Sequence, residues 1–198
     1  MTAQINDVFR YRNREYAVAG ISEGDLFDPT LLCLEPAGTS TACWRGYQAI
    51  FGLSGSLLVL DALHVNLLKP GEGYKRREGP PINGIEPCGP RDEHGWFNNH
   101  YEGLDYHLTY TGGLLIADGF IERLYVHMGF HPAWKYKKVV ELVFDLGILK
   151  NAFDRSREMV EIRREFLALR AGDDPSRPTS EDEIMRFVER AFDRTYPR

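Results

Sequence analysis

Two early stretches of the chain show the alternation of apolar and polar residues that is typical of β-hairpins. Residues 8–18 place aromatic and β-branched side chains on both sides of Arg12-Asn13-Arg14, which predicts a short first hairpin. Residues 39–66 predict a stronger one with its turn at Ser54-Gly55-Ser56, because glycine accepts the positive φ of a tight hairpin. The return strand, 57–60, is apolar on both faces, which favours a central position in a sheet. In the first strand of this hairpin, every second residue points to the same face, which places four residues there: Tyr47, Ala49, Phe51 and Leu53.

Strand patterns return after a long irregular segment. Residues 69–95 contain five prolines and six glycines, and a loop of this length in a compact domain is usually either functional or mobile. Further strands are predicted at 104–110, 114–117 and 123–127. Residues 139–144 fit a strand or a helix, and their β-branched side chains favour a strand that ends in a turn at Gly147.

The end of the chain changes to a helical pattern. From Ser156, apolar residues recur at steps of three and four, and Gly172 is expected to end this helix. Ser180 and Glu183 form a capping box that predicts a second helix. We therefore expect an α+β protein. Residues 1–154 would form a mainly antiparallel β-sheet or a partly open barrel, with the long loop at 69–95, and residues 155–198 a C-terminal helical hairpin packed on it.

Composition narrows the class of protein. Apolar residues make up 43% of the 198 residues and charged residues 27%, as in ordinary soluble domains. The formal net charge of −5 argues against a general nucleic-acid binder, which needs an excess of basic residues. No apolar run reaches the length of a membrane span, and the first residues lack the apolar region of a secretory signal. A bacterial, cytoplasmic protein is the expectation.

The richest polar chemistry lies between residues 92 and 107. A histidine beside a carboxylate is the minimal pair for general acid–base catalysis. A solvated surface is the more common reason for such a composition. The segment nevertheless supplies weak catalytic candidates: His94, His100, His107, Glu102 and Asp105.

Metal and nucleophile motifs are weak. His127 and His131 are four residues apart, but Gly129 and Pro132 oppose a helix, and on a straight strand the two rings would be about 13 Å apart. We therefore expect no metal site, with these two histidines as weak candidates, and no cofactor. Three cysteines without a CxxC spacing predict neither a disulfide framework nor a zinc site. Cys43 beside Arg45 is more typical of a small buried residue than of a nucleophile.

The segment Cys43–Tyr47, followed by a turn and an apolar strand that ends in Asp61, resembles a family of bacterial proteins with a Cys-Trp-Arg-Gly-Tyr strand and no assigned activity. Later matches are Gly103, Leu104, Gly113 and residues 125–129. The resemblance covers roughly residues 5–150. It implies a β-rich architecture and no mechanism. Small acidic bacterial proteins of this kind often act as partners of other proteins, including immunity proteins that neutralise toxins.

The leading hypothesis is a non-enzymatic protein-binding module that uses Trp44, Arg45 and Trp96, with a toxin-neutralising immunity protein as one form of it. The alternatives are a small hydrolase or metal-dependent enzyme that uses the histidine and carboxylate cluster, and a sensor that holds a small ligand near Arg45. The partner is expected to be another protein, and the sequence leaves the oligomeric state open. A charge at the start of a buried strand needs a partner, and Asp61 is the predicted partner of Arg45.

Overall fold

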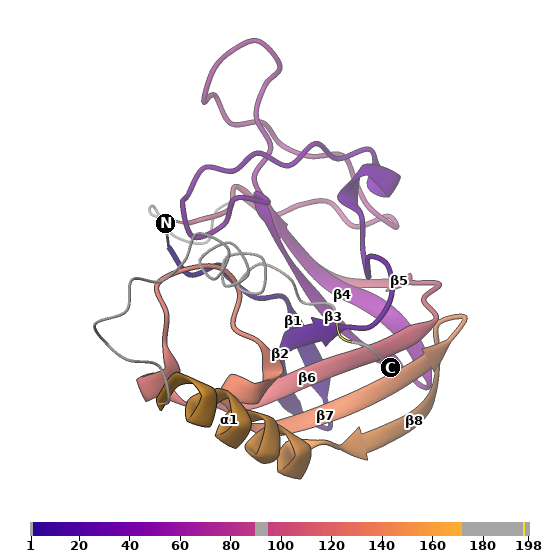
Figure 1. Ribbon diagram of the computed structural model, residues 1–198. Coiled ribbons are helices and arrows are strands. Elements are labelled where there is room, and N and C mark those ends of the chain that lie inside the picture. Colours follow the sequence, from indigo (N-terminus) through magenta and orange to yellow (C-terminus); the bar gives the residue numbers. More distant parts are fainter. Residues whose placement is uncertain (1, 90–94, 172–195, 197–198) are drawn as a thin grey trace.

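The computed structural model describes residues 2–89, 95–171 and 196, and its main feature is one eight-stranded sheet (Figure 1). The order of the strands is β3-β1-β2-β6-β7-β8-β4-β5, and an additional β3–β4 pairing links the beginning of this order to strands near its end. All pairings are antiparallel except β1 with β3, where Val8 lies opposite Ile50. The strands are β1 (Val8–Tyr11), β2 (Arg14–Ile21), β3 (Tyr47–Ser54), β4 (Leu57–Val65), β5 (Asn99–His107), β6 (Gly112–Phe120), β7 (Tyr136–Asp145) and β8 (Ile148–Asp154).

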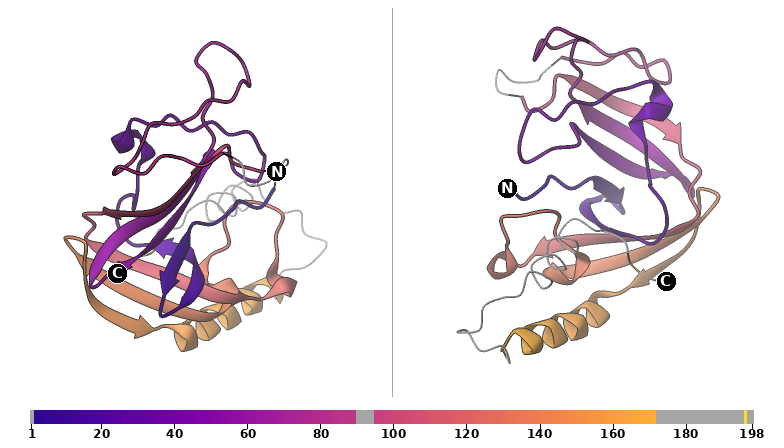
Figure 2. Two further views of the ribbon diagram at one scale, coloured as in Figure 1. Left: turned by 180° about the vertical axis from the view of Figure 1, so that it is seen from behind. Right: turned by 45° about the horizontal axis from the view of Figure 1, so that its top comes forward.

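Strands β3–β5 and β6–β8 face each other as two layers, with the β1–β2 hairpin between them (Figure 2). The main core fills this space. Large side chains on both layers are fully buried there, including Leu60 and Tyr101 on one side and Leu114 and Phe144 on the other. Burial of this apolar surface is the main term that stabilises such a fold.

One helix, α1 (Ser156–Ala171), packs on the other face of β7 (Figure 1). Met159 is buried in a second cluster with Leu115 and Val139. Arg163 donates hydrogen bonds of 2.7 and 2.6 Å to the backbone oxygens of Trp134 and Tyr136, which ties the helix to the start of β7. The described residues also form three 3₁₀ turns, at Pro29–Leu32, Glu122–Leu124 and Ala133–Lys135.

The α+β class and both predicted hairpins are confirmed. The first hairpin turns at Arg12 and Asn13, whose φ values of 49° and 61° are the positive values that a two-residue hairpin turn requires. Strand β4 lies between β3 and β5, as its two apolar faces predicted. The predicted strand at 139–144 is also present, within β7.

Other expectations were wrong or lie outside the described residues. Residues 123–127 form a 3₁₀ turn and a loop instead of a strand. Strand β8 was not predicted, because its side chains are nearly all exposed and show no apolar repeat. The second helix of the expected hairpin falls on residues 172–195, outside the described residues. Within the described part of the chain, no helix has the length and hydropathy needed to cross a bilayer.

Candidate binding site

Arg45 forms a buried ion pair with Asp7. The carboxylate accepts two hydrogen bonds from the guanidinium, of 2.8 and 2.7 Å, and a third of 2.9 Å from the backbone N–H of Ala49. The side chains of Asp7 and Arg45 are only 6% and 18% exposed. Burial lowers the pKa of Arg45 and Asp7 raises it, and the carboxylate prevails, so that the net pKa lies above the usual arginine value. The pair is therefore ionised, and it fixes the segment before β1 to the start of β3.

The predicted partner of Arg45, Asp61, was wrong. The return strand does not end at Leu60 but continues to Val65, so it is Val65 that lies opposite Tyr47 at the start of β3. Asp61 instead lies at an irregular point in the middle of β4, where it pairs with Arg10 on β1. The hydrophobic pattern indicated the hairpin but not the length of its second strand.

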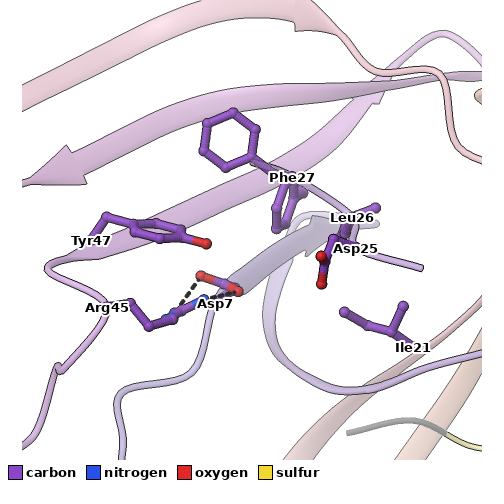
Figure 3. A pocket seen from close by; sticks show the side chains of 8 residues that line it. Asp7, Ile21, Asp25, Leu26, Phe27, Arg45 and Tyr47 are labelled. Atoms are coloured by element: carbon purple, nitrogen blue, oxygen red, sulfur yellow. Dashed lines mark hydrogen bonds and ion pairs between the residues drawn. The ribbon is translucent and has the colours of Figure 1, made fainter. Parts of the chain in front are cut away.

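A cavity of about 140 Å³ lies beside the Arg45–Asp7 pair (Figure 3). Its walls are made by the aromatic rings of Phe27, Phe51 and Tyr47, and by Ile21, Leu26 and Asp25. The guanidinium of Arg45 lies 4.6 Å from the centre of the Tyr47 ring, and Phe27 meets the same ring edge-on. The residues after β2 and the start of β3 therefore converge on one partly polar, aromatic pocket.

Trp44 and Trp96 reach the surface from two segments that are joined at Asn66. The side chain of Asn66 donates a hydrogen bond of 2.7 Å to the backbone oxygen of Trp96, and its backbone N–H donates to the backbone oxygen of Gly46, two residues after Trp44. Asn66 itself is 2% exposed, whereas Trp44 and Trp96 are 50% and 53% exposed. The buried Asn66 is thus bonded to the backbone of both segments that carry these half-exposed tryptophans.

Two further asparagines hold part of the long loop. Asn98 pairs with both backbone groups of Leu67 and donates to the backbone oxygen of Arg77, and Asn99 accepts from the backbone N–H of Gly79. Both side chains are buried. Asn66, Asn98 and Asn99 were not among the predicted functional residues. Their one signal in the sequence was that they flank apolar strands. In the fold their side chains satisfy buried backbone groups of the loop.

The two predicted catalytic histidines that the structure describes, His100 and His107, lie at opposite ends of β5 and do not come together. His94 lies outside the described residues, and His107 and Asp105 are exposed at the far end of β5. His100 does meet a histidine, but it is His64, which was not predicted; the ring centres are 4.5 Å apart. Nε2 of His64 lies 3.1 Å from the Glu102 carboxylate. His100 and Glu102 are two residues apart and lie on the same face of β5, and His64 lies opposite His100, so the strand register brings the three side chains together.

His127 and His131 differ sharply in their surroundings. His127 is exposed and bonds through Nδ1 to the hydroxyl of Tyr125 at 2.9 Å. His131 is 7% exposed and packs against Phe120 and Tyr125. Burial, and then the charge of Lys135, lower the pKa of His131 to about 4. Among the described residues, no group of three or more His, Cys, Asp and Glu side chains is placed to hold a metal ion.

Cys43 is a buried thiol with a structural contact. Its Sγ donates to the backbone oxygen of Tyr47 at 3.2 Å. Burial raises its pKa, against the opposing effect of Arg45. A thiol with a raised pKa is a poor nucleophile at neutral pH.

Comparisons with known proteins add no relative to this picture. No protein-family model matches the chain, and neither a curated protein nor a solved structure does. The resemblance to the family with the Cys-Trp-Arg-Gly-Tyr strand therefore stays a prediction.

Proposed function

We propose that this protein is a non-enzymatic protein-binding module, and that the surface carrying Trp44 and Trp96 is its contact site. The single observation that supports this most is the half-exposure of both tryptophans on segments tied to the buried Asn66. Tryptophan is enriched among the residues that dominate interface energies, because it buries a large area and loses little conformational entropy.

Arg45 has a structural role, unlike the two tryptophans. Its guanidinium is engaged with Asp7 and its exposure is small, so it supports the turn that carries Trp44 and contributes no free charge to a partner. A rigid turn favours binding, because less entropy is lost when the partner docks.

The net charge of −5 favours a basic partner. Complementary charge speeds the encounter of two proteins and suppresses wrong partners. A basic toxin whose activity must be blocked is one partner with this chemistry. The resemblance to the bacterial family with the Cys-Trp-Arg-Gly-Tyr strand implies that such proteins often act as partners of other proteins, including toxin-neutralising immunity proteins.

The test is capture of partners from cells of the source organism with three forms of the full chain. These are the unmodified protein, the double variant Trp44→Ala/Trp96→Ala, and Tyr74→Ala as a matched control. Tyr74 is also a large aromatic residue and is 85% exposed, but it lies in the loop after β4. Circular dichroism confirms that each variant is folded before capture.

We expect a basic protein to be retained by the unmodified chain and by Tyr74→Ala, and to be lost from the double variant. Two interface tryptophans that each contribute about 2 kcal/mol would together change affinity by several hundredfold. Retention of the same proteins by all three forms, or capture of nothing specific, would contradict the proposal.

A second candidate is acid–base catalysis, favoured by one observation. His64 contacts Glu102 at 3.1 Å and His100 through its ring, the arrangement in which a carboxylate orients an imidazole. Turnover of ester or phosphoester substrates that is lost in both His64→Ala and Glu102→Gln, with the fold intact, would favour this candidate. Absence of turnover across such a panel would count against it.

A further inference from the structure

Among the described residues that line the cavity beside Arg45, negative charges outnumber positive ones. Asp7 and Asp25 contribute two carboxylates, and Arg45 contributes one guanidinium. Asp7 and Arg45 neutralise each other, because both carboxylate oxygens of Asp7 accept hydrogen bonds from the guanidinium. The remaining charge is that of Asp25, which is exposed and lies on the side of the cavity away from Arg45 (Figure 3).

Three of the described residues that line the same cavity are aromatic. Phe27 and Tyr47 meet edge-on with ring centres 6.0 Å apart, and Phe51 also lines the space. The faces of aromatic rings attract cations, and this attraction grows when the cation loses its water. Arg45 already uses it, since its guanidinium lies 4.6 Å from the Tyr47 ring centre. An exposed carboxylate beside aromatic walls therefore favours a small organic cation over an anion.

The size of the cavity limits the ligand. It measures about 140 Å³, close to the roughly 150 Å³ of an apolar cavity that holds one benzene molecule in another protein. A group of about five or six heavy atoms fits this volume. The cavity is partly open to solvent, and Asp25 in its lining is exposed.

We propose that this cavity binds an alkylammonium or guanidinium group, with Asp25 as its anionic contact and the Phe27, Tyr47 and Phe51 rings as its walls. The group could belong to a free small molecule or to a lysine or arginine side chain of a polypeptide. The inference goes beyond the proposed protein-binding function, because it does not depend on Trp44 or Trp96.

The experiment is an NMR titration of the full ¹⁵N-labelled chain with four small probes. n-Butylammonium and methylguanidinium are expected to give saturable shifts of the backbone amides of residues 25–27 and 47, with millimolar affinity. 1-Butanol and butyrate, of similar size but neutral and anionic, are expected to bind at least tenfold more weakly. Nα-acetyl-arginine methylamide is titrated in parallel. If it binds as well as methylguanidinium, the cavity accepts polypeptide side chains; if it fails while the free cations bind, the ligand is a small molecule.

Asp25→Asn tests the anionic contact, with Glu23→Gln as its matched control. Glu23 is an exposed carboxylate two residues away that does not line the cavity. We expect Asp25→Asn to weaken the binding of both cations about tenfold, and Glu23→Gln to leave it within twofold. Butyrate shifts as large as those of the cations, unchanged cation binding in Asp25→Asn, or no saturable shifts at all would each overturn the proposal.

Discussion

Replacement of Asp7 by asparagine probes the contact that fixes the candidate site. The substitution Asp7→Asn would keep the shape of the side chain and an oxygen for the N–H of Ala49, but it would remove the charge opposite Arg45. Breaking one side of a buried pair generally costs about 3–5 kcal/mol, because the other charge stays buried. Because the Arg45 side chain is 18% exposed, some water can reach the guanidinium. We therefore expect Asp7→Asn to lower the free energy of unfolding by about 3 kcal/mol, near the lower end of this range.

The matched control is Asp61→Asn. Asp61 and Arg10 also form an ion pair, but their side chains are 32% and 43% exposed, and pairs of this kind usually contribute about 0–1 kcal/mol. The comparison also tests the corrected pairing, because the sequence pattern had placed Asp61 opposite Arg45.

The assay is urea unfolding followed by tryptophan fluorescence and far-ultraviolet circular dichroism. If the free energy of unfolding falls with urea concentration by about 2 kcal/mol/M, a loss of about 3 kcal/mol in stability lowers the midpoint of unfolding by about 1.5 M. Asp61→Asn should move the midpoint by less than about 0.5 M. If Asp7→Asn lowered stability by less than about 1 kcal/mol, or by no more than Asp61→Asn, the account of the buried pair would be refuted.

Three other experiments probe His131, Asn98 and Cys43. Because the pKa of His131 is lowered to about 4 in the folded chain, the unfolded chain binds the proton more readily, and the free energy of unfolding should fall by up to about 3 kcal/mol between pH 6.5 and pH 4. Urea unfolding at several pH values should show a weaker dependence of stability on pH for His131→Phe than for the unmodified chain. Asn98→Ala should lower the free energy of unfolding by about 2–4 kcal/mol and speed tryptic cleavage at residues 75–77, because it removes buried hydrogen bonds that hold the backbone near Arg77. Equal cleavage rates in the variant and the unmodified chain would contradict this. Thiol titration of the folded chain should count the two exposed cysteines at once and Cys43 only after denaturant is added, whereas rapid reaction of all three would show that Cys43 is accessible.

The sequence predicted most of the sheet, because apolar alternation is strong where one face of a strand is buried. The central strand β4 and the hairpin around Gly55 were visible for this reason. Strand β8 was not, because it exposes residues such as Lys150 and Phe153 and lacks a buried face. Local pattern does not reveal a strand that is held mainly by backbone bonds to one neighbour.

The candidate site was less accessible to prediction than the sheet. Trp44, Arg45 and Trp96 were named from residue type, but the contacts that organise them come from Asp7 and Asn66, which are distant in sequence. The same holds for His64, which reaches His100 and Glu102 only through the β4–β5 register. Long-range pairings of this kind carry no local periodicity, so a single sequence does not reveal them.

We propose that the two tryptophans form the contact surface for a protein partner. The most direct test is the dissociation constant of the captured partner, measured by surface plasmon resonance for the unmodified chain, Trp44→Ala/Trp96→Ala and Tyr74→Ala. We expect the affinity to fall by at least about 100-fold in the double variant and by less than about threefold in Tyr74→Ala. A double variant that binds within threefold of the unmodified chain would contradict it.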